Sequence, residues 1–303
     1  MKTFVGLVRR EIWEHPALFV GPLGANLFVA LSMLIAVARG IGSAENLATI
    51  ADSLDLADES VLEVGRNLLF ASPAALVVAV TVAVGYFYFL DCLFAERKER
   101  SILFFKSFPV TDTQTVLAKL FCGIVMLPAL SLIAFAVTQL FVLIIASIAL
   151  LAVGGNVGTV WSVGALFANW LFVLYVLVSA ALWYAAVIAF LVLVSAWAKR
   201  AVYLWSLAPL FAIQAEYLLP GENYLGPLVF GHIGAYPAAG FSVPTELRNG
   251  AAESLASEPG AFRLLSLCDP VGLLAEPALW VNLGLAAAFT FAAIALRRYR
   301  DDS

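Results

Sequence analysis

The sequence predicts an all-α integral membrane protein with six transmembrane helices. Apolar residues make up 63% of its 303 residues and charged residues only 13%, against about 45–50% and about 25% in soluble domains. The apolar residues fall in uninterrupted blocks, each near or above the roughly 18–20 residues that a helix needs to cross the hydrocarbon layer. Because a soluble core cannot hide that much apolar surface, lipid is the expected solvent.

The blocks give the expected elements in chain order, within a single membrane domain over residues 1–303. Residues 1–16 precede the first block, and their apolar positions share one face, largely opposite Arg9, Arg10 and Glu14. That pattern predicts a helix lying in the membrane interface. The six expected transmembrane helices cover residues 17–38, 68–91, 120–153, 163–198, 202–219 and 279–296.

The distribution of Lys and Arg predicts the orientation. With six spans, thirteen of the 17 basic residues fall on one side, and only Arg39, Arg66, Arg248 and Arg263 fall on the other. Basic excess marks the cytoplasmic face, so we expect a multi-pass protein of the cytoplasmic (inner) membrane with both termini in the cytoplasm. The net charge of −4 and the absence of a basic groove argue against nucleic acid as a partner.

The loop between the second and third spans, residues 96–118, is the strongest candidate for a functional segment. Charged residues come first, then an apolar patch and a proline, after which Thr111 or Asp112 can cap a new helix. This pattern suits a short helix that docks on another protein, but it also suits an ordinary loop whose phenylalanines lie among the headgroups. The candidate docking residues are Glu96, Arg97, Glu99, Arg100, Phe104, Phe105, Phe108 and Pro109.

The charged start, the apolar stretch and the Ser107-Phe108-Pro109-Val110 sequence resemble the type-2 ABC export permeases. The resemblance implies a cytoplasmic coupling helix within residues 96–118, a connecting helix at residues 4–16 and membrane lipid around the spans. It also implies re-entrant helices at the outer mouth, formed by the extracytoplasmic segment 222–277, and a second permease copy, identical or related. The chain has no Gly-x-x-x-x-Gly-Lys-Ser/Thr motif for ATP phosphates. ATP and Mg²⁺ would therefore bind a separate ABC ATP-binding subunit, and this chain is expected to bind no cofactor and to be no enzyme itself.

A few polar residues within or near the apolar blocks are candidates to line a transport path. They are Gln139, Asn169, Gln214 and Glu216. Polar side chains at such depth are functional candidates by default, although amides such as Gln139 and Asn169 also form hydrogen bonds between helices.

Two further functions stay open. One is a secondary, ion-coupled transporter, which broken helices in two corresponding halves would favour. The other is a membrane assembly protein without transport activity. An intramembrane protease is disfavoured because the spans contain no paired His and Glu and no buried His–Ser or Lys–Ser arrangement is apparent.

Overall fold

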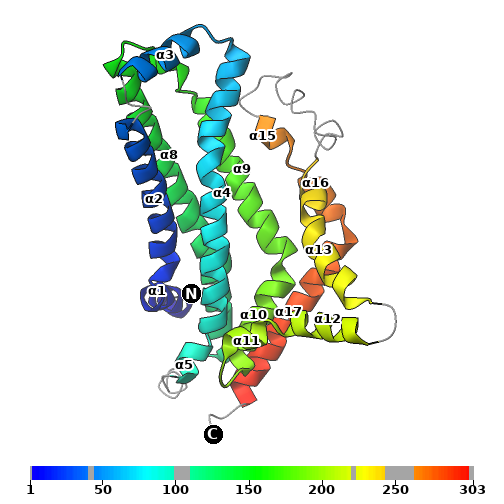
Figure 1. The fold of residues 1–303 in the computed structure, drawn as a ribbon. Helices are drawn as coiled ribbons and strands as arrows, with labels where there is room; N and C mark the ends of the chain where they lie inside the picture. Colours follow the sequence, from blue (N-terminus) through cyan, green and yellow to red (C-terminus); the bar gives the residue numbers. More distant parts are fainter. Residues whose placement is uncertain (1, 40–43, 99–109, 220–222, 243–262, 300–303) are drawn as a thin grey trace.

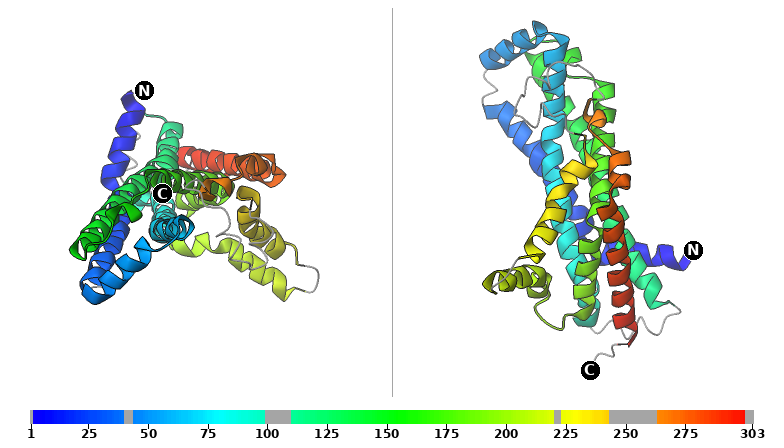
Figure 2. Two further views of the ribbon diagram at one scale, coloured as in Figure 1. Left: turned by 90° about the horizontal axis from the view of Figure 1, so that it is seen from above. Right: turned by 90° about the vertical axis from the view of Figure 1, so that its right-hand side faces the viewer.

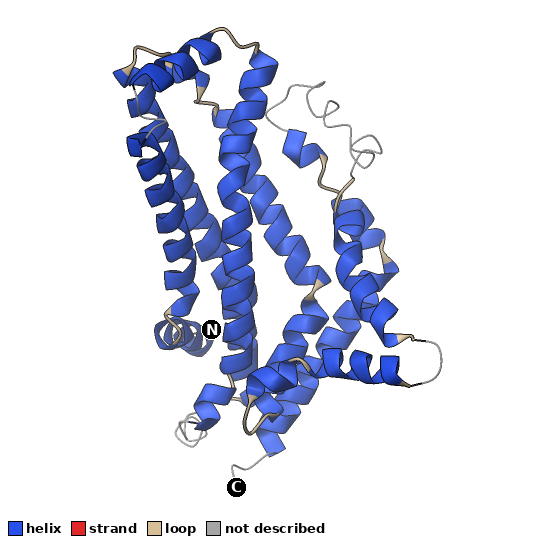
Figure 3. Ribbon diagram, viewed as in Figure 1, coloured by secondary structure: helices blue, strands red, loops and turns tan. Residues whose placement is uncertain are grey.

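The computed structural model describes residues 2–39, 44–98, 110–219, 223–242 and 263–299. Within these residues all regular secondary structure is helical, as Figure 3 shows. The one exception is an isolated β-bridge between Phe241 and Cys268. Five helices are long and apolar enough to cross a membrane; they lie at Ala17–Arg39, Pro73–Lys98, Asp112–Ala152, Val157–Trp183 and Pro277–Tyr299. The predicted class, a helical multi-pass membrane protein, is therefore confirmed.

Two of the first helices run along a long bundle, and a short helix lies across it at each end (Figure 1). Helix α1 (Lys2–Glu14) crosses the bundle axis, while α2 (Ala17–Arg39) and α4 (Glu59–Asp91) run along it (Figures 1 and 2). At the far end, α3 (Ala44–Asp55) joins them. We call the end with α1 and the last turn of α17 the basic end. Helix α4 begins at Glu59, well before the predicted span 68–91.

The third long helix follows the candidate docking segment. Helix α5 (Phe94–Lys98) precedes residues 99–109, and α7 (Asp112–Phe121) follows them. Thr111 caps α7 as predicted: its hydroxyl accepts from the Gln114 amide while the Gln114 side chain accepts from the Thr111 amide. A π-helical turn at Cys122–Met126 leads into α8 (Leu127–Ala152), so the helix begins before the predicted residue 120.

The predicted span 163–198 is two helices and not one. Helix α9 (Val163–Trp183) ends at Tyr184, and α10 (Ala185–Trp197) continues toward the basic end. Tyr184 has φ −97° and ψ 17°, outside the α-helical region. No Gly or Pro lies near this break, so its cause is tertiary and is described below.

The prediction of one helix over 202–219 is wrong. The chain forms α11 (Val202–Ser206) and α12 (Ala208–Leu218), and α12 extends sideways from the bundle (Figure 1). Pro209 lies in the first turn of α12. Proline has no N–H and its ring clashes with the carbonyl four residues earlier, so a helix that entered at Val202 would be kinked or broken there. In this structure the chain breaks at Leu207, which has φ −86° and ψ 0°.

The segment 222–277, predicted to form an extracytoplasmic region with re-entrant helices, contains a 16-residue helix and two short helices. Helix α13 (Leu225–Gly240) runs back along the bundle, α15 (Arg263–Ser266) and α16 (Pro270–Ala275) follow, and α17 (Pro277–Tyr299) returns to the basic end (Figure 1). Residues 243–262 of this segment lie outside the described part of the chain.

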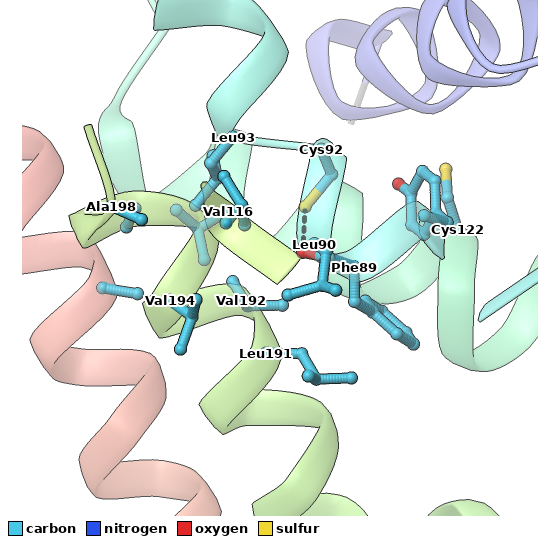
Figure 4. Packing of buried hydrophobic residues seen from close by; sticks show 14 of the residues in the cluster. Phe89, Leu90, Cys92, Leu93, Val116, Cys122, Leu191, Val192, Val194 and Ala198 are labelled. Atoms are coloured by element: carbon cyan, nitrogen blue, oxygen red, sulfur yellow. Dashed lines mark hydrogen bonds between the residues drawn. The ribbon is translucent and has the colours of Figure 1, made fainter. Parts of the chain in front are cut away.

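The main hydrophobic cluster lies at the basic end, where α4, α7 and α10 converge. Leu90, Leu93, Val116 and Val192 pack there with exposed fractions of 2% or less, beside the end of α17 (Figure 4). Cys92 is fully buried among them, and its Sγ donates to the Phe89 carbonyl. The charged groups described next lie beside this cluster, at the same end of the bundle.

Candidate functional site

Glu96, the first residue of the candidate docking segment, lies inside the protein. Its side chain is only 6% exposed. One carboxylate oxygen lies 3.0 Å from Lys119 Nζ of α7, and the other lies 2.6 Å from Arg297 Nη1 of α17. Glu96 therefore joins α5 to the beginning of one long helix and to the end of another, instead of facing a partner protein.

A second buried carboxylate extends the same set of charges to α1. Glu11 is 4% exposed and accepts two hydrogen bonds from Lys119 Nζ, at 2.9 and 2.8 Å. The Tyr88 hydroxyl of α4 lies 3.1 Å from Glu11, and His15 Nε2 lies 3.2 Å from it. The Lys119 ammonium, 1% exposed, is thus shared between two carboxylates from different helices.

The ion pair keeps Glu11 charged. Burial alone raises the pKa of Glu11, but the Lys119 ammonium and the hydrogen bond from His15 outweigh it. The net effect lowers the pKa from 4.5 to about 2. Glu11 is therefore ionised throughout the physiological pH range, and α1 is held to α7 by a charge that does not titrate there.

Asp112 and Arg10 extend the cluster at its edge, where Arg10 also donates to Glu14 at 2.6 and 2.8 Å. Arg297 Nε lies 3.0 Å from Asp112 Oδ1, and Arg10 Nη2 lies 3.6 Å from Glu96. We define the ion cluster as three carboxylates and three cations, namely Glu11, Glu96, Asp112, Arg10, Lys119 and Arg297. Buried charges are tolerated when they are paired and hydrogen-bonded, and costly when one partner is missing. The cluster ties α1, α5, α7 and α17 together.

Arg97 fastens α5 to α10 at the same level. Its guanidinium donates to the backbone carbonyls of Ser195 and Ala198, the latter at 2.9 Å, where α10 ends. In return, the Ser195 hydroxyl accepts from the amides of Leu93 and Phe94, both at 3.0 Å. Helix α5 thus supplies donors to the free carbonyls at the end of α10, and α10 supplies an acceptor to the free amides at the start of α5.

The predicted docking residues therefore divide into two sets. Glu96 and Arg97 bind the bundle itself, and Glu99, Arg100, Phe104, Phe105, Phe108 and Pro109 lie outside the described residues. Sequence reasoning missed Glu11, Lys119 and Arg297 as members of one site. All three resemble ordinary charges flanking membrane spans, and no pattern in the sequence relates positions so far apart.

Two of the predicted path-lining residues lie in the contact between α8 and α9. Gln139 and Asn169 are each 1% exposed. Gln139 Oε1 accepts from the Trp170 indole across the two helices, and the Asn169 amide donates 2.9 Å to the Ala165 carbonyl of its own helix. Their polar atoms serve helix packing in this conformation.

The other two lie on α12, away from the ion cluster. Gln214 is exposed. Glu216 accepts from the backbone amides of Tyr224 and Leu225, both at 2.8 Å. Because those amides begin α13, the carboxylate caps that helix and fixes the corner between α12 and α13.

Among the residues that the structure describes, no group of three or more His, Cys, Asp or Glu side chains is placed to hold a metal ion. Comparison of the chain with protein-family models, with curated proteins and with solved structures gives no match.

Proposed function

We propose that the chain is the membrane-spanning permease subunit of an ATP-driven exporter. The observation that carries the proposal is the way in which the ion cluster holds the start of the segment 96–118 and the helix into which the segment leads. Glu96 anchors its start, and Asp112 marks the helix into which it leads. Through Arg297 and Glu11 the same charges reach α17 and α1. A push on this segment would therefore reach an interfacial helix and two spans.

The proposed topology has six crossings. The five long helices supply five, and α11, α12 and α13 together supply the other, as a bent path in place of the predicted helix over 202–219. The basic end faces the cytoplasm by the positive-inside rule. Both termini then lie in the cytoplasm, and the protein lies in the inner membrane. The part of segment 222–277 that follows α13 forms the extracytoplasmic insertion.

The partners follow from what the sequence lacks. No phosphate-binding loop is present, so ATP and Mg²⁺ bind a separate ABC subunit that docks on residues 96–118. Phe104, Phe105 and Phe108 provide the apolar docking contact of the coupling helix, while Glu96 and Arg97 hold its base. A second permease copy, identical or related, encloses the path.

Co-purification tests this proposal. The tagged chain, isolated from its host in mild detergent, is expected to bring down an ATP-binding subunit in stoichiometric amount. The variant Phe104→Asp/Phe105→Asp is expected to lose that subunit entirely, because two buried carboxylates would disrupt an apolar contact. Leu56→Asp, an 87% exposed position at the opposite end, is the matched control and should retain it.

Failure to recover an ATP-binding subunit with a folded wild-type chain would contradict the proposal. The next candidate would then be a secondary, ion-coupled transporter. The break at Tyr184 favours that alternative, because discontinuous helices surround the binding sites of many such proteins. Transport driven by a proton or sodium gradient in vesicles without ATP would identify it.

A further inference from the structure

The break between α9 and α10 has no cause in its own sequence. Residues 180–188 read Ala-Ala-Leu-Trp-Tyr-Ala-Ala-Val-Ile, with neither Gly nor Pro. Such residues form continuous helix readily, and sharp kinks otherwise arise where a side chain inserts into the backbone ladder. A continuous helix over this block is therefore an available alternative conformation.

Asn282 of α17 is the side chain that inserts. In an unbroken helix the Ala186 amide would donate to the Leu182 carbonyl. Instead, the Ala186 amide lies 3.3 Å from Asn282 Oδ1, and Asn282 Nδ2 donates to Leu182 at 3.2 Å and to Trp183 at 2.6 Å. One buried amide thus replaces the missing bond, accepting from α10 and donating to α9.

Helix α13 holds the other side of the break. The His232 ring stacks on the Trp183 indole at 4.7 Å, and its Nε2 lies 3.2 Å from the Trp183 carbonyl. The Trp183 indole donates 2.9 Å to the His232 carbonyl. Residue 183, the last of α9, is therefore bound to α13 by two hydrogen bonds and a ring stack.

Tyr184 adds a hydrogen bond to a carbonyl of α13 that Pro237 leaves without a helical donor. Pro237 inside α13 has no N–H, so the Ile233 carbonyl, four residues earlier, has no helical donor. The Tyr184 hydroxyl donates to it at 3.0 Å. Further along α9, Tyr175 donates to the Gly240 carbonyl at 2.6 Å. Helix α13 is thus bonded to the second half of α9 and to the break, from Tyr175 to Tyr184, whereas α10 packs on α17.

We propose that the break at Tyr184 is a hinge with two positions. In the broken position, Asn282 and His232 satisfy the backbone groups of residues 182, 183 and 186. In the straight position, Ala186 bonds Leu182 directly and Asn282 is released, so that α9 and α13 swing relative to α10 and α17. A bistable element of this kind converts a small displacement of α17 into a change of the outer half of the bundle.

This inference deepens the proposed function by naming the element that moves. It rests on the proposed function only for the force that drives the hinge. That force would pass from Glu96 of the docking segment to Arg297, which lies on the same helix, α17, as Asn282. The hinge itself is a property of this chain and needs no ATP-binding subunit. A failed co-purification would therefore leave it standing, and a failed distance measurement would leave the proposed function standing.

The test is a distance measurement by pulsed electron paramagnetic resonance in nanodiscs. Spin labels replace Val163 and Trp197, at the outer end of α9 and the last residue of α10, in a chain whose native cysteines are replaced. The variant Asn282→Leu removes the inserted amide, and the label distance is expected to lengthen toward about 50 Å, the length of a continuous helix. Asn169→Leu is the control: it removes a buried amide of α9 that does not contact the break, and it should leave the distance unchanged.

A second variant tests whether the lengthening requires the direct hydrogen bond from Ala186 to Leu182. Ala186→Pro removes the amide hydrogen at residue 186, so Ala186→Pro/Asn282→Leu is expected to keep the short distance. If Asn282→Leu does not fold, His232→Phe, which keeps the ring stack and removes the donor, is expected to lengthen the distance to a smaller degree. An unchanged distance in whichever variant folds, or a lengthening that persists in the Ala186→Pro/Asn282→Leu variant, would overturn the hinge.

Discussion

Lys119→Met is expected to destabilise the chain by about 3–5 kcal/mol, the loss typical of removing one partner from a buried charge pair. The substitution leaves the carboxylates of Glu11 and Glu96 buried beside an apolar side chain. Neither carboxylate can reach water, since the two side chains are 5% and 6% exposed. Thermal or denaturant unfolding in detergent at neutral pH measures the loss. Lys98→Met, an exposed lysine of α5, is the control and should change stability by less than about 0.5 kcal/mol.

A double variant separates the charge effect from lost packing. Glu11→Gln/Lys119→Met neutralises the carboxylate that loses two hydrogen bonds from Lys119, whereas Glu96 keeps Arg297 as a partner. The cost of the double variant is therefore expected to be smaller than the sum of the two single costs. Costs that simply add would show that Glu11 and Lys119 do not act as a pair. A cost of Lys119→Met equal to that of the exposed control would contradict the ion cluster altogether.

Gly123→Ala is the second large effect, expected to cost about 1–3 kcal/mol by overpacking. A Cβ at residue 123 would lie 2.2 Å from Cζ and 2.3 Å from Cε1 of Phe89. The ring cannot easily yield, because Phe89 is 4% exposed and belongs to the hydrophobic cluster at the basic end. Unfolding in detergent measures the cost.

Two companions make that measurement specific. Gly284→Ala places a methyl where no atom lies within 4 Å, so it should be neutral or slightly stabilising through better helix propensity. Phe89→Leu/Gly123→Ala removes the clashing ring edge and is expected to cost less than the two single substitutions combined. A Gly123→Ala variant as stable as the wild type would show that the π-helical turn tolerates a side chain there.

Much of the fold was predictable because the physics of lipid leaves a strong pattern in sequence. Long apolar blocks locate the helices along the bundle, and the helix pattern of residues 1–16 predicts α1, observed at Lys2–Glu14. The cap at Thr111 was predictable from side-chain chemistry alone. Pro209 is visible in the sequence, yet the apolar composition of 202–219 predicts one helix, because a proline can either kink a helix or end it.

The rest depends on contacts between distant residues. The break at Tyr184 has no local signal, because Asn282, almost a hundred positions later, creates it. The ion cluster brings together positions 11, 96, 119 and 297, each of which looks like an ordinary flanking charge when taken alone. The sequence predicts docking roles for Glu96 and Arg97, but it does not distinguish binding to the bundle, which the structure shows, from contact with a partner.

Site-specific photo-cross-linking tests the central claim most directly. A photoreactive phenylalanine analogue at position 105, introduced in the native host, is expected to form a covalent adduct with a protein that carries an ATP-binding motif, identified by mass spectrometry. The same analogue at Leu56, at the opposite end of the bundle, is expected to form no such adduct. A well-expressed chain that gives no ATP-binding adduct from position 105, or the same adduct from both positions, would contradict docking through residues 96–118.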